Sequence, residues 1–203
     1  MFTGIIQTIG QVTDKKEKSG DLSFKIKTNF SQPEQIKLGD SIAMDGVCLT
    51  VTAKADDEVN VDVSVETVNK TTVNQWQTGT ALNLEPAMTL QDQLGGHIVS
   101  GHVDAVGQCI SREPSARSEI FEFEIPHDLM KFVVVKGSIT INGVSLTVNT
   151  VEDNRLSVNL VPHTMQHTNL GGLTAGDAVN IEIDTIARYV EKMLQPHLLN
   201  KTA

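Results

Sequence analysis

The sequence has few of the features that mark secreted or membrane proteins. Only two of its 203 residues are cysteines, Cys48 and Cys109, which is too few for a disulfide framework in a chain of this length. The opening segment MFTGIIQTIGQV has no basic region followed by a long apolar segment, so it predicts no secretion signal. No apolar run approaches the roughly 20 residues that a transmembrane helix needs. We therefore expect a cytoplasmic protein with no membrane partner.

Clustered positive charge is also lacking. The net charge is −9 and the pI is near 5.0, and most basic residues are scattered along the chain. The exception, DKKEK near position 15, is interrupted by acidic residues, which is typical of a solvated turn. Because binding to a phosphate backbone requires clustered cations that displace its counterions, we expect no nucleic-acid partner.

The usual motifs for phosphate, metal and acyl chemistry are missing. The chain has no Gly-rich phosphate loop after a strand, no G-x-S-x-G nucleophile elbow and no EF-hand loop. His163 and His167 are four residues apart, and His97 and His102 stand elsewhere, but no cysteine pair or carboxylate completes a zinc pattern. We therefore expect no metal site.

What the chain does contain is an internal repeat. The segment MDGVCLTV at 44–51 returns as INGVSLTV at 141–148, and the same shift of 97 positions aligns both halves without an insertion. The repeat unit of roughly 90 residues is much longer than a solenoid repeat and occurs twice, so the chain is a tandem duplication of a small domain. Other aligned pairs are Gly4 and Gly101, Phe24 and Phe121, Thr67 and Thr164, and Glu85 and Glu182.

Each half consists of short apolar or alternating segments that are separated by turn signals such as LGD, MDG and QTGT. Six such segments at close and even spacing favour a small closed barrel over a helix-rich domain. We therefore predict an all-β fold of two tandem, similar six-stranded Greek-key barrels plus a C-terminal helix. The predicted strands are 4–12, 22–28, 40–44, 48–53, 59–65 and 81–85 in the first half, and 101–110, 119–125, 138–141, 145–151, 156–161 and 178–183 in the second.

The pattern becomes helical after residue 184. The segment IDTIARYVEKMLQP starts with a possible cap at Asp184 or Thr185, and we expect Pro196 to end the helix. Such a helix either folds back onto its own barrel or packs against copies of itself, and the pattern alone does not decide between the two. Its apolar stripe consists of Ile186, Tyr189, Val190, Met193 and Leu194.

These patterns divide the chain into four parts. We expect the first barrel in residues 1–86, a linker in 87–97, the second barrel in 98–184, and the helix and tail in 185–203. The linker contains LGG, and we expect its glycines to let the second barrel pivot away from the first.

The differences between the two halves are the sharper functional signal. Cys48 is matched by Ser145, and only the thiol becomes a good nucleophile near neutral pH, although a lone cysteine is usually a buried, inert thiol. His102 stands where the first half has Ile5, so it is either a functional imidazole or a structural histidine. Repeated hydroxyls such as that of Ser41 either satisfy local backbone groups or form two matched ligand sites.

Five segments together resemble one family. They are MFTGII at 1–6, GDSIAMDGVCLTV at 39–51, GGHIVSGHVD at 95–104, KGSITINGVSLTV at 136–148 and NIEIDTIARYVEKML at 180–194. With these segments in this order, the sequence resembles the riboflavin synthases of the alpha-chain type over nearly its whole length, tail helix included.

The resemblance implies a cofactor-free dismutation, the last step of riboflavin biosynthesis. Two molecules of 6,7-dimethyl-8-ribityllumazine react, one gives a four-carbon unit to the other, and the products are riboflavin and 5-amino-6-ribitylamino-uracil. Because donor and acceptor are the same molecule, each of the two similar barrels would hold one. The resemblance also implies a homotrimer with its active sites between the first barrel of one subunit and the second barrel of a neighbour, joined by the tail helix. Lumazine synthase is a further candidate partner.

The resemblance also assigns site residues. Ser41, Cys48 and His102 stand at the family's catalytic positions, His102 as a proton carrier and Cys48 as a transient nucleophile or the partner of a nucleophilic water. Phe2 would help to cover the reacting pair, and Asp184 would act across the subunit boundary unless it only caps the helix. The expected first-barrel pocket consists of Gly4, Ile5, Ile6, Cys48, Leu49, Thr50, Asp62, Val63, Ser64, Val65, Glu66, Thr67, Gly101, His102 and Val103. The expected second-barrel pocket consists of Lys136, Ser145, Leu146, Thr147, Asn159, Leu160, Val161, Pro162, His163 and Thr164.

Two other functions compete with this one. A non-catalytic lumazine- or flavin-binding protein would share the fold, but such relatives depart from the family motifs around the second barrel, whereas SGH, KGS and GVSLTV are intact here. A flavin-containing reductase with a related barrel would need a nicotinamide site, and the sequence has no dinucleotide fingerprint. The complete set of motifs therefore favours the enzyme.

Overall fold

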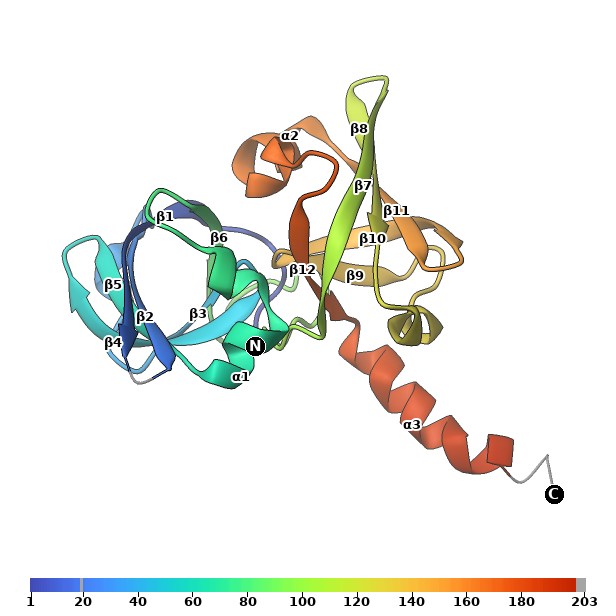
Figure 1. The fold of residues 1–203 in the computed structure, drawn as a ribbon, viewed down its shortest axis with the longest axis horizontal. Coiled ribbons are helices and arrows are strands. Elements are labelled where there is room, and N and C mark those ends of the chain that lie inside the picture. Colours follow the sequence, from blue (N-terminus) through green and yellow to red (C-terminus); the bar gives the residue numbers. More distant parts are fainter. Residues whose placement is uncertain (19, 200–203) are drawn as a thin grey trace.

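Among the described residues, 1–18 and 20–199 of the computed structural model, twelve strands form two closed antiparallel barrels (Figure 1). The first barrel consists of β1 (Thr8–Lys18), β2 (Asp21–Lys27), β3 (Ser41–Met44), β4 (Val47–Ala55), β5 (Glu58–Val63) and β6 (Ala81–Pro86). The second consists of β7 (Ala105–Ser115), β8 (Ser118–Glu124), β9 (Ser138–Ile141), β10 (Val144–Glu152), β11 (Arg155–Leu160) and β12 (Ala178–Ile183). The strand order β1-β2-β5-β4-β3-β6 has its equivalent in β7-β8-β11-β10-β9-β12.

The barrel cores follow from side chains that alternate along the strands. In β2, Phe24 and Ile26 are buried whereas Lys25 between them is exposed, and β8 buries Phe121 and Phe123 in the same way. In each barrel the second strand pairs with the fifth, past the hairpin of the third and fourth, which is the Greek-key order. The predicted fold of two six-stranded barrels is therefore confirmed.

The first strand of each barrel begins later than the sequence predicted. β1 begins at Thr8 rather than at residue 4, and β7 begins at Ala105 rather than at residue 101. Gly4 and Gly101 have φ angles of +75° and +78°, in the left-handed region that glycine adopts at little cost. The chain bends at these glycines, so the residues around them are free to leave their own barrel.

The two segments before these strands, residues 1–7 and 98–104, each reach the opposite barrel and are called the first and second crossing segments. Phe2 and Val99 exchange backbone hydrogen bonds of 2.8 and 3.1 Å. Ile6 packs against the core of the second barrel, and Val103 packs against the core of the first. Because the shift of 97 positions relates Phe2 to Val99 and Ile6 to Val103, the exchange has an approximate two-fold symmetry.

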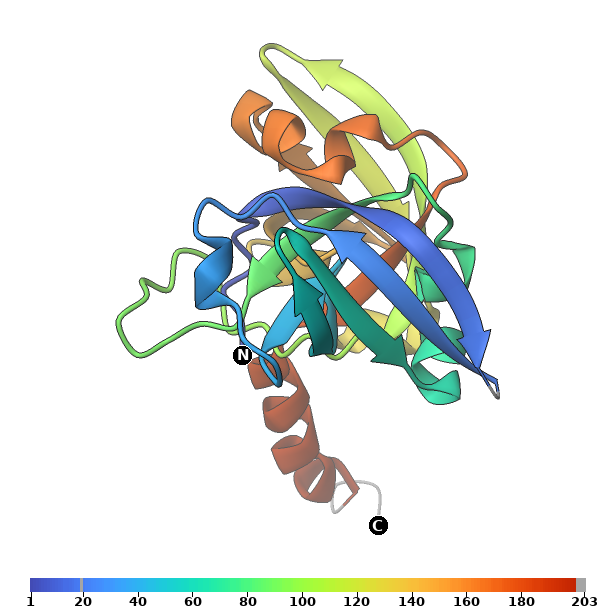
Figure 2. The same ribbon diagram turned by 90° about the vertical axis from the view of Figure 1, so that its left-hand side faces the viewer.

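Asparagines on equivalent strands also join the barrels. The side chain of Asn83 in β6 donates a 2.9 Å hydrogen bond to the carbonyl of Asn142, and that of Asn180 in β12 donates one of 2.9 Å to the carbonyl of Asp45. All four residues are at most 5% exposed, so these bonds are shielded from water. These bonds do not support the expectation that the linker lets the barrels pivot. The linker, residues 87–97, runs beside the barrels as an extended loop (Figure 2).

Short helices lie between the strands and follow the repeat. α1 (Val65–Lys70) and η2 (Thr72–Gln75) in the first half correspond to α2 (Pro162–His167) and η4 (Asn169–Gly172) in the second. The remaining 3-10 turns are η1 (Pro33–Gln35) and η3 (His127–Phe132).

A single long helix, α3 (Thr185–Leu199), projects away from the barrels in both views (Figures 1 and 2). It was expected to end at Pro196 but continues to Leu199. Proline lacks one backbone N–H, but the residues that follow it keep theirs and can still form helical hydrogen bonds. Its contact with η3 includes a 3.0 Å ion pair between Lys131 and Glu191. Within residues 1–18 and 20–199, no helix combines the length and apolar character that crossing a bilayer requires.

The apolar stripe of α3 is not folded back onto its own barrel. Its members are half to three-quarters exposed: Ile186 (60%), Tyr189 (67%), Val190 (49%), Met193 (73%) and Leu194 (51%). Of the two interpretations of this stripe, the structure therefore favours contact with another chain over packing on the second barrel.

Candidate active site

Cys48 lies on β4, where the second crossing segment touches the first barrel. Its half-buried side chain packs against an apolar cluster of Phe2, Ala43 and Val99. Its backbone N–H donates a 2.9 Å hydrogen bond to the carbonyl of Gly101. A Cβ atom on Gly101 would come within 2.7 Å of the Cys48 Cβ, so only glycine permits this approach.

The second thiol is unsuited to nucleophilic chemistry. Cys109 is fully buried, and burial together with the negative charge of Asp177 raises the pKa of its thiol. Of the two cysteines, only Cys48 is accessible from the surface. It is therefore the candidate nucleophile.

Ser145, the equivalent of Cys48, lies on β10 in a polar environment. Its backbone N–H donates a 2.8 Å hydrogen bond to the carbonyl of Gly4, and its Oγ is 2.7 Å from Nδ1 of His97. The other nitrogen of His97, Nε2, is 3.1 Å from Oγ1 of the buried Thr140. Burial lowers the pKa of His97, and the charge of Asp184 acts in the opposite direction. Burial thus favours the neutral form of this imidazole.

The crossing segments change which residues can share a pocket. Gly4, Ile5 and Ile6 were expected in the first-barrel pocket, but the Gly4 carbonyl binds Ser145 and Ile6 packs against the second barrel. These contacts bring the segment to the second barrel as well, a crossing before β1 that the sequence pattern does not reveal. The equivalent segment at 101–103 lies against the first barrel, beside Cys48.

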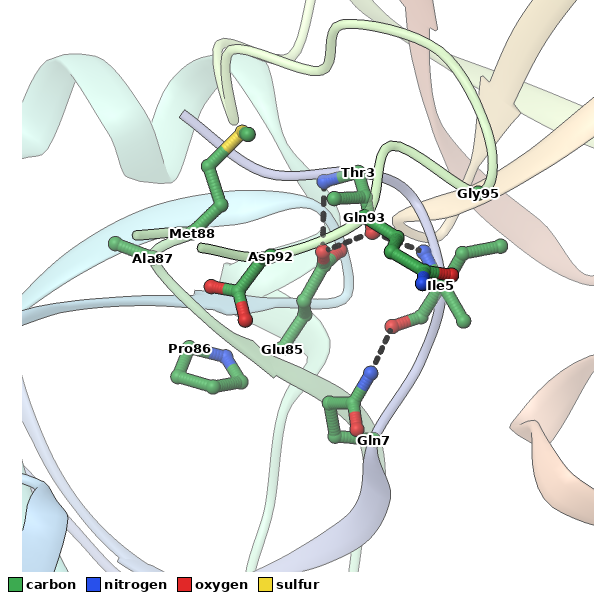
Figure 3. A pocket seen from close by; sticks show the side chains of 10 residues that line it. All are labelled: Thr3, Ile5, Gln7, Glu85, Pro86, Ala87, Met88, Asp92, Gln93 and Gly95. Atoms are coloured by element: carbon green, nitrogen blue, oxygen red, sulfur yellow. Dashed lines mark hydrogen bonds between the residues drawn. The ribbon is translucent and has the colours of Figure 1, made fainter. Parts of the chain in front are cut away.

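Two buried carboxylates hold the crossing segments in place. Glu85 accepts hydrogen bonds from the backbone N–H groups of Thr3 (2.6 Å) and Gly4 (3.0 Å), as Figure 3 shows for Thr3. Glu182 does the same for the N–H groups of Ser100 (2.6 Å) and Gly101 (2.9 Å). Burial raises the pKa of both carboxyl groups, and the hydrogen bonds to them lower it in part. The repeat had paired Glu85 with Glu182, but sequence reasoning assigned them no role.

The remaining first-barrel candidates lie at the ends of strands. Ser41 on β3 pairs with Thr50 on β4, and it lines a cavity of about 630 Å³ that also includes Phe30 of the η1 loop. The segment 62–67 covers the end of β5 and the start of α1, where Ser64 caps the helix by accepting a 3.4 Å hydrogen bond from the Thr67 N–H. The equivalent segment 159–164 covers the end of β11 and the start of α2.

His102 and Asp184 are both near the crossing segments. The side chain of His102 is exposed, and its backbone N–H donates a 3.2 Å hydrogen bond to the Ser100 hydroxyl. Asp184 accepts a 2.9 Å hydrogen bond from the N–H of Ile186, so it does cap α3. The same carboxylate influences the titration of His97, which keeps Asp184 a candidate for the site as well.

Lys136 adopts a backbone conformation that suggests a function. Its φ is +67°, which is uncommon for a residue with a side chain, whereas the equivalent Gly39 has φ +86°. Both N–H groups donate to a carbonyl of the neighbouring strand, Lys136 to Val148 and Gly39 to Val51. A lysine where the first barrel has glycine keeps Lys136 a candidate for the site.

A cavity of about 390 Å³ lies between the first crossing segment, the end of β6 and the linker (Figure 3). Its walls include Ile5, Gln7, Glu85 and Asp92. The residues in 1–18 and 20–199 contain no group of three or more His, Cys, Asp or Glu side chains that could hold a metal ion.

The comparisons with known proteins agree with the repeat. A model of the lumazine binding domain matches residues 3–87 and again 100–184. The chain is 41% identical to the riboflavin synthase of Photobacterium phosphoreum over 194 residues, which are 96% of this chain and 89% of that protein. It is 39% identical to the riboflavin synthase of Bacillus subtilis, over 100% of this chain and 94% of that protein. The chain belongs to the riboflavin synthase family.

Solved structures extend this likeness to the fold. LumP complexed with riboflavin has a TM-score of 0.84 and 26% sequence identity to this chain, over 90% of this chain and 99% of LumP. LumP complexed with 6,7-dimethyl-8-(1'-D-ribityl) lumazine has a TM-score of 0.81 at the same identity. The two-barrel fold of this riboflavin synthase family member thus also occurs in a protein crystallised with a lumazine and with a flavin.

His97, Thr140, Glu85 and Glu182 are the residues of the candidate site that sequence reasoning missed. His97 lies in the family segment at 95–104, but it has no counterpart in the first half, because the shift of 97 positions would place that counterpart before residue 1. Thr140 does have a counterpart, Ala43, and this polar-for-apolar difference was a usable signal.

Proposed function

We propose that the protein is a riboflavin synthase, which converts two molecules of 6,7-dimethyl-8-ribityllumazine into riboflavin and 5-amino-6-ribitylamino-uracil. The observation that carries this proposal is a duplicated lumazine binding domain whose equivalent strands present Cys48 in one half and Ser145 in the other. Two nearly equal sites suit two copies of one substrate, and the difference between them suits a donor and an acceptor. Relatives that are about 40% identical over nearly the whole chain bear this activity in their names.

The proposed chemistry needs little more than positioning and proton transfer. The ring methyl group of the lumazine is acidic, because its carbanion is delocalised into an electron-poor ring, and a base such as His102 assists the proton loss. Cys48 adds to an electron-poor C=N carbon of the partner ring, with the electron pair moving to nitrogen, and leaves again as thiolate when the carbanion replaces it; alternatively, Cys48 holds a nucleophilic water against that carbon. Two flat rings held face to face react as if in one molecule, which can lower the barrier by several kcal/mol.

We further propose a homotrimer with its active sites between neighbouring subunits. The exposed apolar stripe of α3 supports self-association, since single-chain packing leaves it in water. Phe2 and Asp184 would then meet in one site from different subunits, Phe2 with the first barrel of one subunit and Asp184 at the end of the neighbouring second barrel. In this proposal residues 1–86 and 98–184 are the two ligand-binding units, and 185–203 form the contact between subunits.

The cell location and further partners are part of the same proposal. The sparse cysteines support a cytoplasmic location. Lumazine synthase, as the source of the substrate, remains a candidate partner. Lys136, Ser145 and the segment at 159–164, together with Gly4–Ile6, would line the second pocket, and Cys48–Thr50, the segment at 62–67 and the segment at 101–103 would line the first.

A second candidate function is the non-catalytic binding of a lumazine or flavin. It is favoured by one observation, the likeness to LumP, which was crystallised with both kinds of ligand. The two functions differ in what happens to bound ribityllumazine. The deciding experiment mixes the purified protein with 6,7-dimethyl-8-ribityllumazine without metal or nucleotide and follows flavin absorption. One riboflavin for every two lumazines consumed supports the synthase, and a stable complex without flavin supports the binding protein.

A further inference from the structure

Ser145 differs from Cys48 not only in its own chemistry but also in what holds it. The Ser145 hydroxyl is 2.7 Å from His97 Nδ1, and the opposite nitrogen of that imidazole is 3.1 Å from the Thr140 hydroxyl. Both His97 and Thr140 are buried, at 9% and 1% exposure. Hydrogen bonds among buried groups are costly to leave unmade, so this chain of three side chains is held in one arrangement.

The linker is shaped to bring His97 to this position. A Cβ atom on Gly96 would lie 2.8 Å from the Ser145 Oγ and 2.2 Å from the carbonyl oxygen of Thr3. Glycine is thus required for the linker to pass between the first crossing segment and β10. The residue that follows it, His97, then points its ring at the hydroxyl.

The first barrel has no such arrangement. Thr140 is matched by Ala43, which has no hydroxyl, and Cys48 packs against apolar side chains, among them Phe2. The duplication gives His97 no counterpart at all. At this matched pair of positions, a hydroxyl held by an imidazole therefore occurs in the second barrel and not in the first.

We infer that His97 is a positioning residue for the second-barrel pocket: together with Thr140 it orients the Ser145 hydroxyl toward the bound lumazine or flavin ring system. This inference rests on the proposed function, since it takes the pocket at Ser145 to be one of two ligand sites. His97 itself does not contact the ligand in this account. It acts through Ser145, and the first pocket has no part in it.

Two conservative substitutions separate the ring nitrogens. The amide of His97→Asn can replace the polar atom at Nδ1, next to Ser145, whereas the longer amide of His97→Gln can replace the one at Nε2, next to Thr140. If His97 were purely structural, both variants would change the stability of the protein by similar amounts, and both ligand sites would be affected alike. A positioning role makes Asn a substitute for His and Gln a failure.

The test is a fluorescence titration of the full-length protein with riboflavin, resolved into two binding steps, with ribityllumazine turnover and thermal melting measured beside it. Ser145→Ala identifies the step that belongs to the second barrel. We expect His97→Gln to weaken that step roughly tenfold, the range of one lost hydrogen bond, and to leave the other step unchanged. His97→Asn should stay within about threefold of wild type, and the double variant Ser145→Ala/His97→Gln should be no weaker than Ser145→Ala.

The control is His127→Gln on η3, an exposed histidine that should leave both binding steps and turnover unaltered. If His97→Gln and His97→Asn behave alike in an active protein, or if the double variant shows additive losses, His97 is structural and the inference is overturned. If wild-type protein converts no ribityllumazine and binds no riboflavin, the proposed function itself fails, and the role of His97 fails with it.

Discussion

The two barrels share their strand order, their turns, the asparagines that bond across the interface and the buried glutamates that bind the crossing segments. They differ at the positions where a ligand would bind. In the first barrel, Cys48 packs against Phe2 and other apolar side chains. In the second, Ser145 is bound to His97, and a strained Lys136 occupies the position of a glycine. The duplication has kept the residues that build the fold and varied those of the candidate site. A comparison of aligned positions in the two barrels therefore identifies the residues that could distinguish the two sites.

The largest effect is expected from removing helix α3, which has no counterpart in the first half of the chain. Ending the chain after Ile183 removes α3 and its exposed stripe but leaves all twelve strands. We expect monomers whose activity is lower by roughly 100-fold or more, because groups held by two subunits are no longer positioned together. Sedimentation velocity and riboflavin formation measure the two effects.

A milder variant separates assembly from the loss of Asp184. Met193→Ser on the apolar stripe should also dissociate the protein, whereas Lys192→Ser on the exposed polar side should not. A fully active trimer from the truncated chain would contradict the role given to α3.

The next effect concerns the aligned pair Cys48 on β4 and Ser145 on β10. Cys48→Ser should lower turnover about 100-fold, because a hydroxyl is a much poorer nucleophile than a thiol near neutral pH. Ser145→Ala should mainly weaken ligand binding, about tenfold, because it removes one hydrogen-bonding group. Steady-state kinetics with ribityllumazine separates the two, as a change in kcat and a change in KM. Unchanged turnover in both variants would show that the asymmetry between Cys48 and Ser145 is not functional.

A third difference lies in the interface between the barrels. Burial raises the pKa of Asp45 to about 7, although hydrogen bonds from the Asn83 N–H and the Asn169 side chain oppose this rise. The equivalent residue in the second barrel is Asn142, whose Oδ1 accepts from the Asn180 N–H in the same way at 2.8 Å. The second barrel thus keeps the hydrogen bond without a titratable group.

Asp45→Asn should therefore stabilise the protein in a pH-dependent manner. The folded state retains the Asp45 proton up to about pH 7, whereas the unfolded chain releases it near its ordinary pKa of 3.8, so the free energy of unfolding falls as the pH rises between these values. At pH 8 we expect the variant to be more stable by roughly 1–3 kcal/mol, given about 1.4 kcal/mol per pKa unit, and at pH 4 nearly equal to wild type. Denaturant unfolding at both pH values measures the difference in stability. An equal increase at pH 4 and pH 8 would show that the pKa of Asp45 is not raised in the folded state.

Much of the fold could be predicted from the sequence because the repeat shows each strand pattern twice. The alternation in segments such as DLSFKIK is local, and the same pattern 97 positions later made a chance match implausible. The crossing of Phe2 and Ile6 into the second barrel could not be predicted in this way. It depends on contacts between residues more than 80 positions apart, such as Glu85 with Thr3, and local patterns carry no information about them.

The candidate site was predictable to the extent that it lies within repeated motifs. Cys48 and Ser145 were found because they are aligned and different. His97 was considered only as a metal ligand, since neither its contact with Ser145 nor its burial can be read from its neighbours in the chain. A comparison of Thr140 with Ala43 would have pointed to a polar partner in the second barrel, but not to which residue it was.

The smallest expected effect tests the fourth difference, Lys136 against Gly39. A side chain at positive φ costs about 1 kcal/mol relative to glycine, so Lys136→Gly should raise the free energy of unfolding by up to that amount while weakening ligand binding. The reciprocal Gly39→Lys has open space for a side chain, so its cost should come from the backbone alone and leave binding unchanged. Thermal unfolding and ligand titration of the two variants form a matched pair. A stability gain in Lys136→Gly with full binding would mean that the strain serves no ligand, and the second pocket would then lose its only proposed cation.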